Sequence, residues 1–137
     1  MTSKENLIWL AGLIDGEGCI HSHMTGKNNP SIQVQVHCAS KIMVDSIEEI
    51  YLKEGIEYFR DLPFRQPKST KDTHRITVRK KASIIKILRL IVIFMKVKSQ
   101  EADLAIDYIN KYPNRSITAT LEEKESFVSK LRQLKRI

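Results

Sequence analysis

The sequence predicts an α+β fold, in which helices cover one face of an antiparallel sheet and the other face stays open. Two pairs of short segments have the spacing of β-hairpins, and segments with helical spacing precede, separate and follow them. Antiparallel hairpins interleaved with helices are typical of this class. No motif occurs twice, so the chain is not a tandem repeat.

The first half of the chain is expected to fold as a helix, a hairpin and a second helix. Serines stand where an N-cap is needed and glycines where each helix should end, at Ser3, Gly16, Gly18, Ser40 and Gly55. Between the helices, apolar and polar residues alternate with the period of a half-buried strand. The expected elements are a helix at 4–14, strands at 19–25 and 31–38, and a helix at 41–54.

The second half is expected to add another hairpin and three helices. A polar loop around Pro67 separates two strand segments, Pro113-Asn114 breaks the chain, and Thr120 with Glu123 has the spacing of a capping box. The expected elements are strands at 57–65 and 73–79, helices at 81–94 and 99–112, and a last helix after Thr120. We assign residues 1–112 to a core and residues 113–137 to a helical extension of the same domain.

The composition fits one domain that binds a polyanion. The 137 residues are 42% hydrophobic, which is enough for a sizeable core, and the formal net charge is +7. Residues 60–98 carry twelve lysines or arginines against two acids. Such a basic block indicates a phosphate-facing surface, with an ordinary solvated face as the alternative.

The sequence predicts an intracellular protein. Its two cysteines do not make a disulfide framework, and the N-terminus lacks the pattern of a signal peptide. Lysine and arginine interrupt the most apolar run, at 84–94, and the run is too short to span a bilayer. An organellar and a bacterial host fit equally well.

An unusual segment spans residues 10–18, Leu-Ala-Gly-Leu-Ile-Asp-Gly-Glu-Gly. It is apolar nearly all round, so the helix must be buried on more than one side, and Ala11 and Gly12 would let another helix approach closely. Asp15 and Glu17 stand at the C-terminal end, where the helix dipole is already negative. A bound Mg²⁺ would resolve this conflict, because carboxylates are its preferred ligands. The alternative is a pair of acids that merely face solvent.

This segment resembles the signature of the LAGLIDADG homing endonucleases and differs from it only at Gly16 and Glu17, where the family has Ala and Asp. The resemblance extends over residues 5–110, because the order and lengths of the elements also fit. It implies an αββαββα fold with a saddle-shaped four-stranded antiparallel sheet. It also implies a site-specific endonuclease that cuts double-stranded DNA across the minor groove of a long pseudo-palindromic site, in the service of intron homing.

The resemblance assigns roles to several residues. Glu17, at the eighth motif position, would bind the metal next to the scissile phosphate with Gly16 beside it, whereas Asp15 resembles a structural helix-end acid. Mg²⁺ is the implied cofactor; Mn²⁺ or Ca²⁺ could replace it, Ca²⁺ without cleavage. Residues 94–100 are similar to the family's Lys-x-x-Gln region, which makes Lys98 the implied active-site lysine, with Gln100 and Lys96 as lesser candidates.

One motif in one chain implies a homodimer, because family members carry two motif helices, one from each half. The expected dimer interface consists of Leu10, Ala11, Gly12, Leu13 and Gly16. The family's polar water-ordering side chain has no clear counterpart here: of Cys38, Ala39 and Ser40, only Ser40 could play that part. No membrane and no small-molecule substrate are expected.

The open sheet face is implied to meet DNA in the major groove. Gln can bind adenine and Arg guanine through two hydrogen bonds. Alternation along the strands assigns to this face His21, His23, Thr25, Gln33, Gln35, His37, Tyr58, Arg60, Arg75, Thr77 and Arg79. Four lysines are better placed for phosphates: Lys68, Lys71, Lys80 and Lys81.

Other functions remain open at this point. An intron-RNA maturase or a non-cleaving DNA-binding protein could share the fold, although the presence of Glu17 and Lys98 argues against a degenerate relic. A purely structural α+β dimer is disfavoured by the basic block. Zinc binding by Cys19, His21 and His23 is disfavoured because ligands spaced in this way along one strand diverge.

Overall fold

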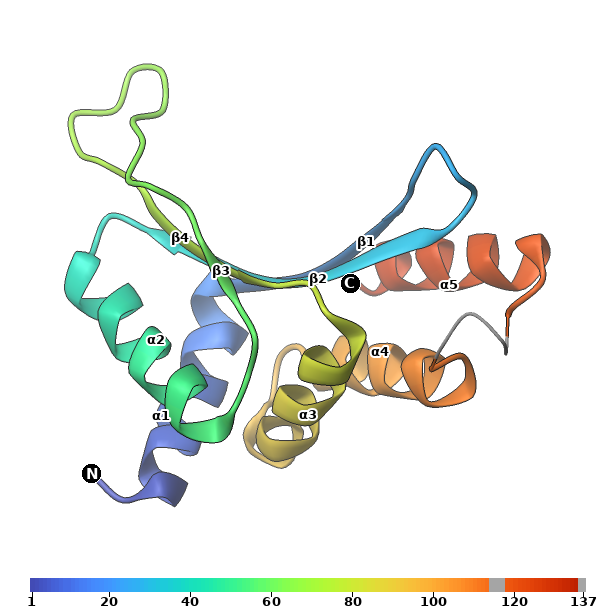
Figure 1. Cartoon of the computed structure of the whole chain (residues 1–137), viewed down its shortest axis with the longest axis horizontal. Coiled ribbons are helices and arrows are strands. Elements are labelled where there is room, and N and C mark those ends of the chain that lie inside the picture. Colours follow the sequence, from blue (N-terminus) through green and yellow to red (C-terminus); the bar gives the residue numbers. More distant parts are fainter. Residues whose placement is uncertain (114–117, 136–137) are drawn as a thin grey trace.

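The α+β class and the αββαββα order are confirmed. The computed structural model describes residues 1–113 and 118–135 and contains a four-stranded antiparallel sheet in the order β1-β2-β4-β3. Helices lie on one side of this sheet (Figure 1). The elements are α1 (Ser3–Glu17), β1 (Gly18–Met24), β2 (Pro30–Cys38), α2 (Lys41–Glu54), β3 (Phe59–Arg60), β4 (His74–Val78), α3 (Lys81–Ile91), the 3₁₀ turn η1 (Val92–Phe94), α4 (Ser99–Lys111) and α5 (Leu121–Leu134).

Helix α1 is longer than the sequence predicted. Thr2 caps it in place of Ser3, because its hydroxyl accepts from the Glu5 backbone and the Glu5 carboxylate accepts from the Thr2 backbone. The helix runs through Gly16 to Glu17, since only Gly55 among the glycines takes the left-handed backbone that ends a helix. At Gly18 a Cβ would lie 2.8 Å from the Ile14 Cα, so this junction requires glycine.

The core lies between the sheet and the helices beneath it. Val34 stands opposite Ile20 on β1 and opposite Val78 on β4, and Val36 stands opposite Ile76. All five side chains are completely buried, and burial of each stabilises the fold by about 1.5–3 kcal/mol. The alternation predicted for β2 is therefore confirmed, and it fixes which face remains for function.

Strand β3 is much shorter than the predicted 57–65. Pro63 cannot donate to a strand ladder, so regular pairing stops before it. Pairing resumes only as an isolated bridge between Phe64 and Thr73. Helix 81–94 is likewise shorter than predicted, because its last turn tightens into η1.

The sheet is curved, and both of its ends rise on the side opposite the helices (Figure 1). One end is the turn between β1 and β2, and the other is the 61–73 loop. Helix α5 packs beneath β1 and against α4 through Phe127, Val128 and Leu131. The capping box predicted at Thr120 and Glu123 is confirmed, as are Ser40 and Gly55 at the ends of α2.

Within residues 1–113 and 118–135, the helices are too short or too polar to cross a membrane. Helix α4 ends at Lys111, close to the predicted break at Pro113-Asn114. Asn114 itself lies outside the described residues.

Candidate active site and nucleic-acid interface

The end of α1 is tied to the segment that leads into α4. The Asp15 carboxylate accepts hydrogen bonds from the backbone N–H groups of Lys96, Val97 and Lys98 at 2.6, 3.2 and 2.9 Å. Burial tends to raise the pKa of Asp15, but these three donors and the Lys98 charge outweigh it and hold the pKa below its ordinary value. Asp15 is therefore a structural acceptor, as the sequence indicated.

Lys98 is brought to the motif helix. Its ammonium group donates to the Asp15 backbone carbonyl, and its side chain is half-buried. The carbonyl belongs to the last turn of α1, so the ammonium lies where the negative end of the helix dipole attracts it. Gln100, two residues further on, lines a groove between α4 and α5 with Leu104 and Leu134. Of the three predicted residues, Lys98 is therefore the one whose side chain is bonded to the motif helix, whereas Lys96 is bonded to it through its backbone N–H.

Glu17 and Gly16 are exposed at the end of α1. Among the residues that the structure describes, no hydrogen bond or ion pair engages the Glu17 carboxylate, and no three His, Cys, Asp or Glu side chains form a metal-binding group. The exposed part of this corner thus offers one hard oxygen ligand from a side chain, Glu17, together with a main-chain carbonyl. These residues fit a divalent ion that also takes ligands from a second chain or a substrate phosphate.

Glu101 is a charged residue at this corner that the sequence reasoning missed. It lies in the first turn of α4, is 6% exposed, and its Oε2 atom has no hydrogen-bond partner among the described residues. Burial raises the pKa of Glu101, and the charges of Lys135 and Lys98 oppose that shift. The helical spacing of three residues from Lys98 is the signal that could have found it.

One face of α1 has no neighbour among the described residues. Gly12 and Gly16 are exposed, and no atom lies within 4 Å of where a Cβ on either would stand. Ile8 on the same face is 44% exposed, and Leu13 is half-buried. Leu10 and Ala11 are completely buried in the core of the same chain, so these two predicted interface residues are unavailable to a partner.

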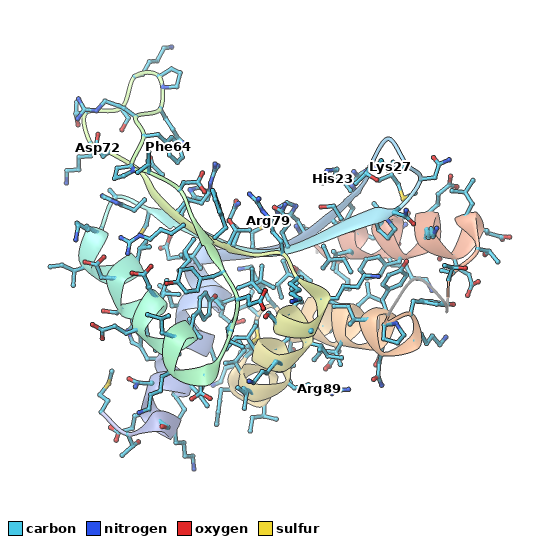
Figure 2. All side chains as sticks on the ribbon, viewed as in Figure 1. His23, Lys27, Phe64, Asp72, Arg79 and Arg89 are labelled. Carbon is cyan, nitrogen blue, oxygen red and sulfur yellow. The ribbon has the colours of Figure 1, made fainter. Side chains whose placement is uncertain are left out.

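The open sheet face carries most of the predicted base-reading side chains. The strand register pairs His21 with Gln33, Gln35 with Thr77, and His37 with Arg75, which places these residues on one face. His23 and Arg79 point away from the helices in Figure 2. His23, His37 and Arg79 are exposed, whereas His21, Thr25, Gln33 and Gln35 are half-buried.

Four predicted readers on this face bond to one another in two pairs, Thr77 with Gln35 and His21 with Gln33. Thr77 is completely buried, and its hydroxyl accepts from the Gln35 amide at 3.0 Å. Burial lowers the pKa of His21, as do the charges of Lys135 and His23, while a hydrogen bond to Gln33 opposes the shift. These effects favour the neutral form of His21, which can both donate and accept a hydrogen bond.

Arg75 in β4 and Arg79 directly after it are held differently. The Arg79 guanidinium lies 4.9 Å from the centre of the Phe59 ring. Arg75 stacks on Phe64 at the same distance, and its Nε also donates to Asp61 at 2.9 Å in an ion pair. The guanidinium N–H groups of Arg79 can therefore donate to a ligand, whereas Asp61 already accepts from one edge of the Arg75 guanidinium.

Tyr58 and Arg60 do not face the open side, which corrects the sequence prediction. The Tyr58 hydroxyl donates to Glu48 of α2 at 2.8 Å, and Arg60 pairs with Glu48 and with Asp45. The register explains the difference, because Phe59 stands opposite the open-face residue Thr77 and Arg60 stands opposite the core residue Ile76. Phe59, 51% exposed, is the residue of β3 that the open face presents.

The four lysines predicted to bind phosphate differ in exposure and in their partners. Lys68 and Lys71 are exposed in the 61–73 loop, and Lys80 forms an exposed ion pair with Glu57 at 3.1 Å. Lys81 is half-buried and donates to the Tyr112 carbonyl at the end of α4, so its side chain does not lie on the open face, and its contact with phosphate stays a prediction. The physical reason is that α3 begins at Lys81 and turns it toward α4.

Residues 10–120 match the LAGLIDADG endonuclease family. The chain belongs to this family. The match begins at the first residue of the motif, Leu10, so the LAGLIDADG helix of the family corresponds to the second half of α1. The comparison with curated proteins found no match.

Two solved structures are similar in fold. The homing endonuclease I-CvuI, in complex with a DNA target that is not cleaved, is 18% identical with a TM-score of 0.75; the match covers 96% of this chain and 83% of that one. The LAGLIDADG meganuclease I-AabMI, bound to uncleaved DNA, is 15% identical with a TM-score of 0.63; the match covers 93% of this chain and 42% of that one. At these identities the likeness establishes the LAGLIDADG fold alone.

Proposed function

We propose that this chain is a site-specific DNA endonuclease that acts as a homodimer with divalent metal ions. The observation that carries the proposal is the end of α1, where the free Glu17 carboxylate lies at the same helix end as an anchored Lys98. A carboxylate that holds a metal ion and an ammonium that offsets phosphate charge can both accelerate hydrolysis of a phosphodiester. Family membership supports the same reaction.

Each residue of this corner would have its own role in the reaction. Glu17 and the Gly16 carbonyl would hold the metal ion, which when bound polarises the scissile phosphate and lowers the pKa of the attacking water. Lys98 would stabilise negative charge on the phosphate oxygens. Asp15 would act as a positioning residue, because its carboxylate fixes the backbone of Lys98 and of the two residues before it.

Dimerisation is supported by the unpartnered face of α1. Gly12 and Gly16 leave open space on that face, and Ile8, Ile93 and Val97 are 44%, 77% and 75% exposed. Ile93 and Val97 lie in the segment between α3 and α4, which packs against α1. A second α1 seated on Gly12 and Gly16 would cover exposed apolar surface and place the two Glu17 carboxylates near each other. The match to less than half of I-AabMI also supports a two-chain assembly.

The curved open face would bind the DNA duplex. Arg79, His23 and His37 are exposed there, and Arg can bind guanine through two hydrogen bonds. The solved structures of this fold, I-CvuI and I-AabMI, hold DNA, which supports a duplex as the ligand. With one such face in each protomer, the recognised site would be long and pseudo-palindromic.

The test is selection of a binding site from a randomised duplex library, followed by cleavage of the selected duplex. We expect cleavage of both strands with Mg²⁺ or Mn²⁺, binding without cleavage with Ca²⁺, and no cleavage with EDTA. Binding without cleavage under every metal condition would favour the non-cleaving alternative. Absence of any selected duplex, together with binding to intron RNA, would favour a maturase.

A further inference from the structure

A lysine-lined cavity lies beside the sheet, apart from the motif helix. Its volume is about 860 Å³, and its walls come from the β1–β2 turn, the junction of β4 and α3, the end of α4 and the start of α5. Lys27, Lys80, Lys81 and Lys124 line it, together with Tyr108 and Tyr112.

The cavity has excess positive charge. In the described part of the chain, no carboxylate lines it. Two acids touch lining residues from outside: Glu57 pairs with Lys80 where both side chains are more than half exposed, and Glu123 accepts from the Tyr112 hydroxyl. The exposed pair neutralises the Lys80 charge only weakly. The charges of the other three lysines, Lys27, Lys81 and Lys124, are not offset by a carboxylate that lines the described part of the cavity.

Two of these ammonium groups are held in place by neutral acceptors. Lys81 donates to the Tyr112 carbonyl at 3.2 Å, and Lys124 donates to the Asn29 side chain at 2.8 Å. Burial lowers the pKa of Lys81, and the charge of Lys124 lowers it further. An anion bound between the two groups would relieve both effects.

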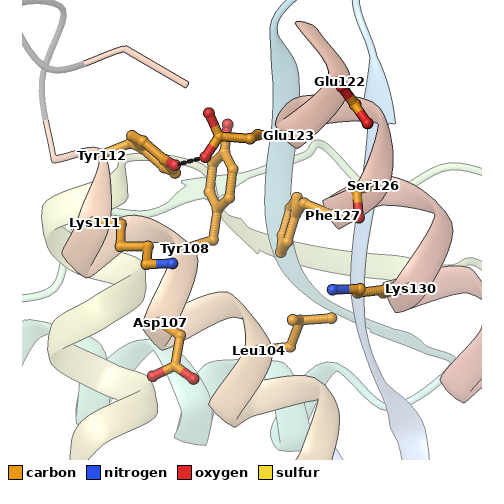
Figure 3. Close-up of a pocket in the computed structure, with 10 residues that line it drawn as sticks. All are labelled: Leu104, Asp107, Tyr108, Lys111, Tyr112, Glu122, Glu123, Ser126, Phe127 and Lys130. Atoms are coloured by element: carbon orange, nitrogen blue, oxygen red, sulfur yellow. Dashed lines mark hydrogen bonds between the residues drawn. The ribbon is translucent and has the colours of Figure 1, made fainter. Parts of the chain in front are cut away.

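The walls are preformed by the packing of α4 on α5. Figure 3 shows Tyr108 stacked on Phe127 and Tyr112 bonded to Glu123, and the stacked ring centres are 4.2 Å apart. These contacts fix the position of α5, and hence of Lys124, relative to Lys81. A site ordered before binding loses less entropy when its ligand arrives.

We propose that this cavity binds a phosphate of the DNA backbone, which rests on the proposed DNA-binding function. Lys27 lies at the β1–β2 turn, on the open side in Figure 2, and Lys80 directly follows the open-face residue Arg79. The cavity therefore lies at the margin of the base-reading face. Its contacts give affinity without base preference, and they assign α5 a role in holding DNA.

The test compares Lys27→Gln, Lys124→Gln and the double variant with the matched control Lys130→Gln, whose exposed lysine on α5 lies outside the cavity. Affinity for the selected duplex is measured over a range of salt concentrations. Each cavity variant is expected to lower the slope of log K against log salt by about one per protomer, with unchanged base preference. The control keeps the wild-type slope.

Neutral methylphosphonates placed at the flanking positions of the duplex locate the contact. They should weaken binding of the wild type and leave binding of the double variant unchanged. Lys124→Gln also loses the bond to Asn29 and could be unstable for that reason. In that case Lys27→Gln tests the proposal alone, because the Lys27 side chain makes no hydrogen bond among the described residues.

Three outcomes overturn the proposal. If the cavity variants keep the wild-type slope while Arg79→Ala weakens binding, the cavity does not hold DNA and the proposed function stands. If inorganic phosphate at constant ionic strength raises the Tm of the wild type but not of the double variant, and the DNA slope is unchanged, the site takes free phosphate. If the wild type binds no duplex, the proposed function and this inference both fail.

Discussion

The end of the motif helix and the open sheet face hold their side chains in different ways. At the helix end, Asp15 accepts three backbone hydrogen bonds, Gly18 packs against Ile14, and Lys98 is bonded to the helix itself. On the sheet face, Arg79 rests on an aromatic ring, and His23 and His37 are exposed. Chemistry requires fixed geometry, whereas recognition tolerates replacement of one side chain by another. The molecule thus separates a constrained corner, which is the proposed catalytic site, from an adaptable surface.

Glu17→Gln gives the largest expected effect on the catalytic side of this comparison. Cleavage should fall at least about a hundred-fold, the scale on which one preorganised catalytic group matters, while duplex affinity is kept or rises. The measurement is single-turnover cleavage beside equilibrium binding. Glu49→Gln, an exposed acid on α2, is the control and should cleave normally. Near wild-type cleavage by the Glu17 variant would remove it as the metal ligand.

Gly12→Leu tests whether the open side of the motif helix, rather than its buried side, meets a partner. Its side chain would enter open space in the protomer, so the fold should survive and gain helix propensity of about 0.8 kcal/mol, but a partner helix could no longer approach. The neighbouring Ala11→Leu should instead destabilise the protomer by about 1–3 kcal/mol, because Ala11 is completely buried. Sedimentation velocity and thermal unfolding distinguish these results. A Gly12→Leu variant that remained dimeric would place the interface elsewhere.

Asp15→Asn tests how strongly the catalytic corner is held. Loss of charge-assisted bonds to backbone donors should cost about 2–3 kcal/mol of unfolding free energy and reduce cleavage by displacing Lys98. The pKa of Asp15 is lowered in the fold, so its contribution is complete above the unfolded value and is lost as pH falls through the folded one. Denaturant unfolding of both proteins between pH 7 and pH 2 should show curves that converge at the acid end. A constant difference would mean that the charge plays no part.

Arg79→Ala and Arg75→Ala should differ on the recognition side. Truncation of Arg79 should cost about 1–3 kcal/mol of duplex affinity per half-site and relax preference at one base pair. Truncation of Arg75 leaves the nearly buried Asp61 carboxylate without its cation, so that variant should also lose stability. Binding to single-base variants and thermal unfolding together measure both effects. An unchanged base preference for Arg79→Ala would mean that Arg79 does not read a base.

The sequence could predict the helix corner and the phase of β2, because their signals are local. The nine-residue motif is contiguous, and Ile32, Val34 and Val36 allow only one buried face. The sequence could not predict which residues of β3 point to the open face, because Tyr58, Phe59 and Arg60 are residue types that suit either face. Their orientation depends on Asp45 and Glu48 of α2, which bind Arg60 only once the chain is folded. The sequence also left open which of Leu10, Ala11 and Gly12 face the core and which face a partner. A helix that is apolar all round gives no signal that separates the two sides.

Glu101→Gln is the smallest expected effect and asks whether the catalytic corner contains a destabilising group. Glu101 is 6% exposed with one unpartnered oxygen, and burial raises its pKa against the opposing charges of two lysines. An acid with a raised folded pKa stabilises the fold fully only below its unfolded value, and that stability is lost as pH rises through the folded one. The amide should therefore raise the unfolding free energy by about 1 kcal/mol at pH 8 and make little difference at pH 4. Denaturant unfolding at the two pH values measures this. A variant less stable at pH 8 would show that the Glu101 charge is needed by Lys98 and Lys135, and the corner would then be held by an ion network that includes α5.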